Sequence, residues 1–329
     1  MMAAQAATAV AEPSAIEVSV NAHFGVGCLK DTVKASGWDR PIIPHLTPKK
    51  KDYFLWDSDL LATMVVCRAN GYPLRIHGDP GCGKSEHPRQ YCAWLNLPLI
   101  EIAGSENKDE ASLLGYQKQK IVNGEKVWTW VDGLLTTSVR NGYCCLINEE
   151  SFISPGVKAQ LHSLLDGQPL VLDDNEGEVI MPAKGFQLFL TDNTDGGGDI
   201  NGVFGGARDT NIATMRRMAH FRLSYPAEDK EKEILVRLYP KLTGAIPLMV
   251  KFANAARISA ANRELRAPIT TDTLIKWCAT QVLLKQATTF SDPAERAFRI
   301  VHFDGQSSAD RMKLAELYSA EIGANNLGA

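Results

Sequence analysis

Residues 78–85 have the types and the spacing of a phosphate-binding loop. They match the pattern G-x-x-x-x-G-K-[S/T] and lie between an apolar run at 73–77 and a helical pattern at 84–95. Glycines let backbone N–H groups turn inward around phosphate oxygens, and the N-terminus of the following helix adds its positive dipole end. We expect the lysine to bridge the β- and γ-phosphates and the serine hydroxyl to ligate Mg²⁺. The residues are Gly78, Asp79, Pro80, Gly81, Cys82, Gly83, Lys84 and Ser85.

A second polar cluster follows the apolar run 143–147, where Asn148, Glu149 and Glu150 stand in a row. In a nucleotide hydrolase such a strand usually ends in Asp-Glu, which holds magnesium and polarises the attacking water. In the register that we favour, Asn148 takes the metal side with a weaker amide oxygen and Glu149 polarises water. A register shifted by one residue uses Glu149 for the metal and Glu150 for water, but it buries Asn148 in the strand. Solvated glutamates without a role are the remaining alternative.

The elements that must position these residues form an alternating pattern. Five apolar runs alternate with helical patterns, which is typical of a parallel α/β sheet. The runs lie at 73–77, 97–103, 143–147, 186–191 and 218–225. The first leads into the glycine loop, and the third ends at Asn148. Two hairpins interrupt the alternation, at 119–130 with a strong Asn123-Gly124 turn signal and at 170–182.

The length of 329 residues fits one large domain with a smaller companion. We expect residues 1–51 to be a disordered or irregular segment, 52–226 to form the α/β nucleotide-binding domain, and 227–329 to form a small all-helical lid. The helical patterns of this last part lie at 227–239, 246–265, 271–287 and 309–323.

Composition excludes several other classes of protein. The net charge of −3 and the absence of a basic groove signature argue against nucleic-acid binding. No apolar run approaches the ~18 residues of a membrane span, and no basic, apolar leader opens the chain. The seven cysteines form no C-x-x-C pair, which indicates free thiols in a reducing cytoplasm rather than a metal site.

Taken in order along the chain, these motifs resemble those of MoxR-type AAA+ ATPases. The two hairpin inserts are the most specific feature, because the glycine loop alone is common to many folds. Within that group the chain is most similar to the small ATPase subunit of aerobic cobaltochelatase, from about residue 52 to the C-terminal end. Shorter segments add to the likeness: Leu113-Leu114-Gly115, Gly133-Leu134-Leu135, Leu190-Thr191-Asp192-Asn193-Thr194, Met215-Arg216-Arg217 and 297–303.

The resemblance implies ATP and Mg²⁺ as cofactors and a homo-oligomer, a hexameric ring with ATP at the subunit boundaries. Asn193 matches the sensor-1 position, which orients the water near the γ-phosphate. Arg217 matches the arginine finger, which stabilises the charge that develops on a neighbour's γ-phosphate. Arg216 stands where the family usually has an acidic residue, so either it or Arg208 is a further candidate. With Glu149, the implied catalytic residues are thus Asn193 and Arg217, and Ser85 and Asn148 face the metal.

Two features stay open at this stage. The family often places a sensor-2 arginine near the start of the helix at 271–278, where this chain has Asp272, so Arg263 or Arg266 would have to substitute from upstream. In the first hairpin, Trp128 and Trp130 either grip a substrate chain or pack onto the core.

Three functions follow as hypotheses. The first is a chaperone-like remodelling ATPase that works on a protein partner, such as one with a von Willebrand A-type domain. The second is the ATPase subunit of a chelatase that inserts cobalt into a tetrapyrrole, although nothing in this chain visibly binds a tetrapyrrole. The third, which Asn148 motivates, is a nucleotide switch that does not hydrolyse.

Overall fold

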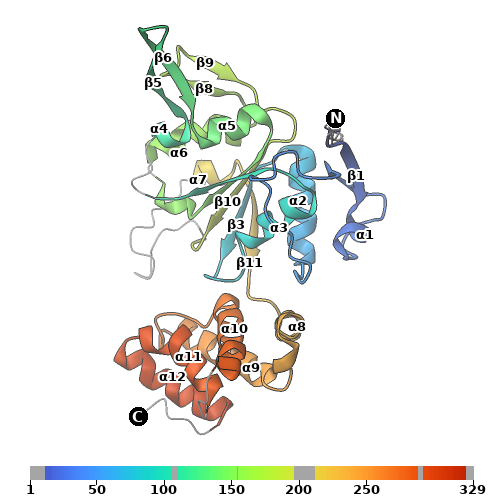
Figure 1. The fold of residues 1–329 in the computed structure, drawn as a ribbon, viewed down its shortest axis with the longest axis vertical. Coiled ribbons are helices and arrows are strands. Elements are labelled where there is room, and N and C mark those ends of the chain that lie inside the picture. The colour runs from blue at the N-terminus through green and yellow to red at the C-terminus, as the bar shows by residue number, and fades with distance from the viewer. Residues whose placement is uncertain (1–11, 106–109, 154, 196–211, 288–291, 324–329) are drawn as a thin grey trace, which may run out of the picture.

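The computed structural model describes residues 12–105, 110–153, 155–195, 212–287 and 292–323. Its centre is a sheet of five parallel strands in the order β11-β3-β10-β7-β4 (Figure 1). Each predicted apolar run forms a strand, which confirms the α/β fold class. The strands are β3 (Leu74–Gly78), β4 (Leu99–Ala103), β7 (Cys144–Asn148), β10 (Gln187–Asp192) and β11 (Ala219–Leu223).

Both faces of the sheet are buried, as its near-continuous apolar strands require. Along β7, Cys144 and Leu146 belong to one core cluster, whereas Cys145 and Ile147 belong to another. On the first side lie α2 (Ser58–Asn70) and α3 (Glu86–Trp94), and on the second α5 (Leu134–Asn141) and α6 (Pro155–Leu165). The packing on both faces therefore holds the sheet in place, and its strands carry the polar site residues at their carboxyl ends.

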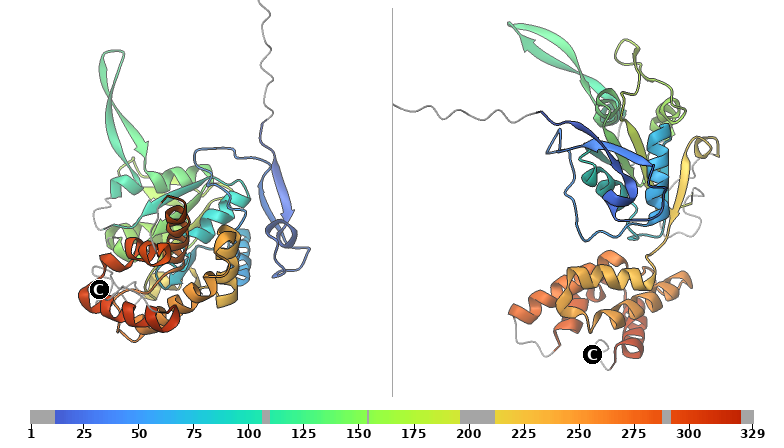
Figure 2. Two further views of the ribbon diagram at one scale, coloured as in Figure 1. Left: turned by 60° about the horizontal axis from the view of Figure 1, so that its bottom comes forward. Right: turned by 90° about the vertical axis from the view of Figure 1, so that its right-hand side faces the viewer.

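Two hairpins project from the end of the core that lies away from the lid (Figures 1 and 2). The first pairs β5 (Gly115–Val122) with β6 (Glu125–Asp132), and its turn residues Asn123 and Gly124 take φ of 53° and 86°. Positive φ at both turn positions matches the twist of the flanking strands. The second pairs β8 (Leu170–Leu172) with β9 (Glu178–Ile180). Both hairpins were predicted from the sequence.

The tryptophans of the first hairpin differ in their surroundings. Trp130 packs against the second core cluster and donates its indole N–H to Asp132 over 2.9 Å. Trp128 is 64% exposed. Only one of the two rings therefore packs onto the core.

The N-terminal segment corrects one expectation. Residues 1–51 were expected to be disordered or irregular, yet the structure has β1 (Ala15–Ser19), α1 (Val20–Phe24) and β2 (Lys34–Trp38) there. The Phe24 ring packs at 5.0–6.0 Å between centroids against aromatic rings of the core: Trp56, Tyr91 and Trp94. This order depends on contacts with residues distant in sequence, which no local periodicity reveals. Residues 1–11 lie outside the described part.

The C-terminal part is a helical unit with its own core. It contains α8 (Glu228–Leu238), α9 (Ile246–Ala261), α10 (Thr271–Ala287), α11 (Pro293–Val301) and α12 (Ser308–Glu321). An aromatic cluster fills its centre and comprises Phe252, Trp277, Phe298 and Tyr318. The predicted boundary between residues 226 and 227 falls in the link from β11 to α8.

Candidate nucleotide-binding site

The glycine loop between β3 and α3 wraps around the amino group of Lys84. Its Nζ donates to the carbonyl oxygens of Gly78 (2.8 Å) and Asp79 (2.6 Å), and the residue is 8% exposed. Burial lowers the pKa of this ammonium group, against the opposing effect of nearby anionic groups. At Gly81, with φ of +70°, a Cβ atom would lie 2.4 Å from the side chain of Thr270 in the lid. The loop thus needs glycine where the lid approaches it.

Asn148 lies against the serine of the loop. Its Oδ1 accepts hydrogen bonds from the Ser85 hydroxyl over 2.5 Å and from the Thr191 hydroxyl over 3.0 Å. Ser85 caps no helix through its side chain, so its hydroxyl is directed at this cluster rather than at α3. Three neutral oxygen atoms from β7, β10 and the loop therefore converge at one point, on the metal side that the favoured register gives to Asn148.

The two glutamates after Asn148 lie in different environments. Glu149 lines a cavity of about 410 Å³ together with Lys84, Ser85 and Asn193. It has a left-handed backbone with φ of 54°, which is uncommon for a residue other than glycine. Glu150, in contrast, is 3% exposed. The structure thus brings Glu149, and not Glu150, to the same cavity as the glycine loop.

Glu150 belongs to a buried ionic network behind the site. Arg75 on β3 is fully buried and donates to Glu150 (2.8 Å) and to Asp192 at the end of β10 (2.7 Å). Lys158 lies 3.3 Å from the other Glu150 oxygen. Burial raises the pKa of the Glu150 carboxyl, but Lys158 and Arg75 outweigh it and the net pKa is lowered. The network holds β3, the end of β10 and the turn after β7 together.

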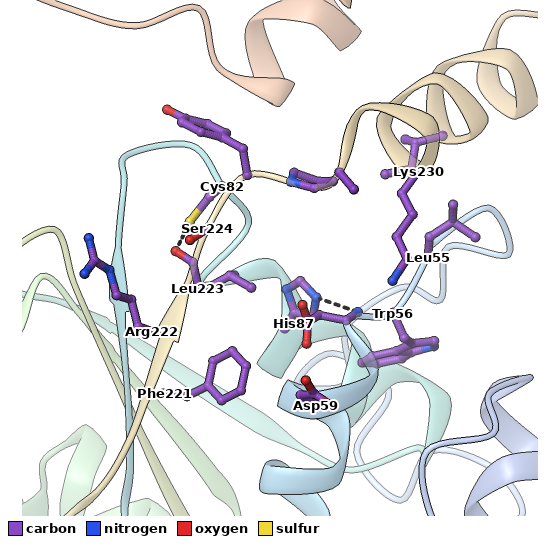
Figure 3. Close-up of a pocket in the computed structure, with 15 residues that line it drawn as sticks. Leu55, Trp56, Asp59, Cys82, His87, Phe221, Arg222, Leu223, Ser224 and Lys230 are labelled. Atoms are coloured by element: carbon purple, nitrogen blue, oxygen red, sulfur yellow. Dashed lines mark hydrogen bonds between the residues drawn. The ribbon is translucent and has the colours of Figure 1, made fainter. Parts of the chain in front are cut away.

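A second cavity of about 370 Å³ lies on the other side of the loop (Figure 3). It is lined by the loop residue Cys82, by His87 on α3, by Trp56, by 221–227 and by Lys230. The His87 Nε2 accepts from the backbone N–H of Asp57 (3.4 Å), so its Nδ1–H donates to the Gly83 carbonyl (3.0 Å). Burial lowers the pKa of His87, which favours the neutral ring that this pairing needs.

The link to the lid is tied to the loop by a tyrosine. Tyr225 donates its hydroxyl to the carbonyl of Pro80 over 2.6 Å, and the Arg257 guanidinium lies 4.1 Å from the centre of its ring. Arg257 in turn pairs through two nitrogens with the buried Glu231 (2.7 and 2.8 Å), which also accepts from Thr271 at the start of α10. Helices α8, α9 and α10 are thereby connected to the phosphate loop.

The two arginine-finger candidates in the described part of the chain, Arg216 and Arg217, do not line the phosphate cavity. Arg217 donates to Asp166 (2.7 Å) and to the carbonyl of Ala213 (2.7 Å), just after the short helix α7 (Ile212–Met215). Arg216 is exposed. Arg208 lies outside the described residues.

The lid contributes an acidic group to the phosphate cavity. Asp272, in the first turn of α10, lines that cavity and pairs with Lys276 over 2.5 Å. Arg263 and Arg266 are exposed and are not among the residues that line it. The sensor-2 position therefore stays without an assigned residue.

Sequence reasoning missed three of these residues. Thr191 lies in the segment 190–194, two residues before Asn193, and a hydroxyl at the end of an apolar run was the available signal. Arg75 inside an apolar strand was a second signal, because a charge is buried only when it is paired. Nothing in the sequence pointed to Tyr225.

The oxygen atoms around Ser85 suit a hard cation that is bound at the same time by anionic groups of a ligand. Hydroxyl and amide oxygens are acceptable Mg²⁺ ligands, and Mg²⁺ commonly takes few protein ligands beside substrate phosphates and water. In the described residues, no group of three or more His, Cys, Asp and Glu side chains could hold a metal ion. The residues thus fit Mg²⁺ bound with a nucleotide. Separately, none of the described helices is long and apolar enough to cross a membrane.

Comparisons with known proteins show which proteins this chain is similar to. The family profile "AAA domain (dynein-related subfamily)" matches residues 73–204. The aerobic cobaltochelatase subunit CobS of Sinorhizobium sp is 27% identical over 315 residues, which cover 93% of this chain and 90% of that protein. Protein NorQ of Paracoccus denitrificans is 30% identical over 56% of this chain and 64% of its own length. Protein CbbQ of Hydrogenophilus thermoluteolus is 29% identical over 57% of this chain and 66% of its own length.

Proposed function

Because this chain carries an AAA domain and is related to the MoxR-type AAA+ ATPases, we propose that it binds ATP with Mg²⁺ and hydrolyses the γ-phosphate. One observation carries the proposal: Lys84, Ser85, Asn148, Glu149 and Asn193 line a single cavity. In it, an ammonium group, a metal-side oxygen cluster and a free carboxylate stand together, which are the parts that phosphoryl transfer to water requires.

The proposed roles follow from position. Lys84 and the loop N–H groups bind the β- and γ-phosphates, and the second cavity beside Cys82 and His87 receives the nucleoside. Ser85, Asn148 and Thr191 face Mg²⁺, which when bound neutralises charge on the phosphate oxygens. Glu149 accepts a hydrogen bond from the attacking water, and the Asn193 amide orients that water.

The position of Glu150 supports the unshifted register. Its carboxylate is paired with Arg75 and Lys158 and is 3% exposed, so it is not available to polarise a water near the loop. Asn148, which the shifted register would bury without a role, instead lies against Ser85.

A phosphate-release assay tests both the activity and the register. Lys84→Ala and Glu149→Gln should each reduce turnover at saturating ATP by about 10² or more. Glu150→Gln, a matched change one residue further on, should retain most of the turnover of its folded fraction. Robust turnover in Glu149→Gln with loss in Glu150→Gln would establish the shifted register. A wild-type chain that binds ATP without releasing phosphate would support the switch that Asn148 motivates.

The proposed assembly is a hexameric ring that acts on a protein partner. Arg217 supports it, because an arginine held away from its own cavity has a catalytic use only at a neighbour's site. We place the ring in the cytoplasm, where the seven free cysteines would stay reduced. A von Willebrand A-type protein is the partner to test first: its co-elution with the ATP-bound ring supports remodelling, and failure to associate in any nucleotide state argues against it.

A cobalt chelatase is the second candidate, since CobS matches this chain over nearly its whole length. In that case the chain would act as the ATPase subunit beside a larger, metal-inserting subunit. Reconstitution decides between them. Cobalt insertion that requires this chain and Lys84 supports the chelatase, and ATP turnover that no chelatase subunit alters counts against it.

A further inference from the structure

The two hairpins carry opposite net charges, and the side chains responsible form no ion pair with the residues that the structure describes. The first hairpin bears Lys118, Lys120 and Lys126, and the turn of the second bears Asp173, Asp174 and Glu176. All six residues are exposed, and in the described part of the chain none of their side chains forms an ion pair. Both hairpins project from the same end of the core, but they diverge, as the right-hand view of Figure 2 shows.

The same hairpins also expose apolar side chains. On the first, Ile121 is 74% exposed and Trp128 is 64% exposed. On the second, Val179 is 61% exposed and Met181 is 64% exposed, while their neighbour Ile180 points into the core at 5%. Exposed apolar side chains that gather on one element are a mark of an interaction site. Each hairpin therefore combines exposed apolar side chains with a net charge. That charge is positive on the first hairpin, where three lysines outnumber the exposed Glu125, and negative on the second.

The base of the first hairpin is tied to the turn end of the second hairpin. Arg140 on α5 donates to Asp132 at the end of β6 (2.8 Å) and through two nitrogens to Glu178 on β9 (2.8 and 3.0 Å). The acidic turn of the second hairpin is thus held beside the base of the first. A set geometry lowers the entropic cost of a protein contact.

We propose that the basic β5–β6 hairpin of one copy of this chain docks against the acidic β8–β9 hairpin of a second copy. One chain carries both halves of the contact, so each copy can use its basic hairpin on one neighbour and its acidic hairpin on another. Such a head-to-tail contact closes into a ring when the rotation fits. The opposite charges select the partner and its orientation. Trp128 on one hairpin and Val179 and Met181 on the other supply the buried apolar area. This inference rests on the proposed ring and adds a contact separate from the ATP cavity.

Charge reversal tests the contact. One variant carries Lys118→Glu, Lys120→Glu and Lys126→Glu, and a second carries Asp173→Lys, Asp174→Lys and Glu176→Lys. Sedimentation velocity with ATP and Mg²⁺ should show that each variant alone loses the assembled species, because like charges then face each other. An equimolar mixture of the two should regain it, since every contact between unlike variants pairs opposite charges again. Circular dichroism and thermal melting confirm that both variants are folded.

A control with the same change in net charge as the variant of the basic hairpin is Lys30→Glu, Lys241→Glu and Lys285→Glu, at exposed lysines of the N-terminal segment and the lid. It should assemble like the wild type. Wild-type assembly that either hairpin reversal leaves intact, or a mixture that stays dissociated, would overturn the contact and leave the hairpins to bind a client protein. A wild-type chain that remains monomeric with ATP would overturn the ring, and the contact with it.

Discussion

Asn148 sets the electrostatics of the metal side. Two hydroxyl groups, from Ser85 and Thr191, already point at its Oδ1, so an aspartate of the same shape would accept both hydrogen bonds. We expect Asn148→Asp to lower the Mg²⁺ concentration for half-maximal turnover by about fivefold, because hydrogen bonds to a charged acceptor gain ~1 kcal/mol over neutral ones. A magnesium titration of phosphate release at fixed ATP measures the shift. The control is Asn141→Asp at the end of α5, which adds the same charge at an exposed position outside the cavity. An equal shift in both variants would show that the effect does not come from the hydrogen bonds to Asn148.

His87 makes the stability of the loop depend on pH. Burial lowers its pKa below that of the unfolded chain, so between the two values the unfolded state binds more protons. The stability that the neutral ring contributes is therefore present above about pH 6.5, and it is lost progressively as the pH falls below that value. Melting temperatures measured from pH 7 to 5 should fall for the wild type and fall less for His87→Gln. The exposed His45→Gln control should keep the wild-type profile.

The two glutamates in the turn after β7 have different roles. Glu149 lines the cavity, whereas Glu150 stabilises the fold through its ion pairs. Glu150→Gln leaves Arg75 buried beside a neutral amide, and removing one partner of a buried ion pair costs about 3 kcal/mol of unfolding free energy. Glu149→Gln, in the same turn but open to the cavity, should change it by less than about 0.5 kcal/mol. Urea unfolding followed by fluorescence compares them directly. Equal losses in both would show that Arg75 does not depend on Glu150.

The link between β11 and α8 is the element through which the lid contacts the loop. Tyr225→Phe removes only the hydroxyl that donates to Pro80 and keeps the ring under Arg257. The loss of one hydrogen bond of ~1 kcal/mol should weaken nucleotide binding about fivefold. Turnover at saturating ATP should change little. Titration with a fluorescent ATP analogue provides the dissociation constant, and Tyr239→Phe in the lid is the matched control. An unchanged constant would mean that the loop holds its conformation without the tyrosine.

At the scale of the whole molecule, those features could be predicted from the sequence that a local residue pattern encodes, such as helix bounds and hairpin turns. Helix α10 begins and ends at the expected residues 271 and 287, and the Asn123-Gly124 turn lies at the tip of the first hairpin. Sequence reasoning missed what depends on contacts between distant segments. The pairing of β1 with β2 has no periodic pattern of its own, and Arg75 becomes intelligible only once Glu150 and Asp192 are brought beside it. The same holds for Arg257 and Glu231, which lie 26 residues apart.

The proposed ring predicts that no single chain forms a complete active site. Each active site would combine its own Glu149 with Arg217 from a neighbour, and Arg217 would have to leave Asp166 to reach it. Glu149→Gln and Arg217→Ala should therefore each be inactive alone. When they are mixed in equal amounts, about a quarter of the sites in random rings join an intact glutamate to an intact arginine, so phosphate release should recover to that order. A mixture of Glu149→Gln with Lys84→Ala is the control and should stay inactive, because both changes disable the same subunit's site. Recovery in neither mixture would show that Arg217 does not act at a neighbour's site, and Arg216 and Arg208 would then be tested in the same design.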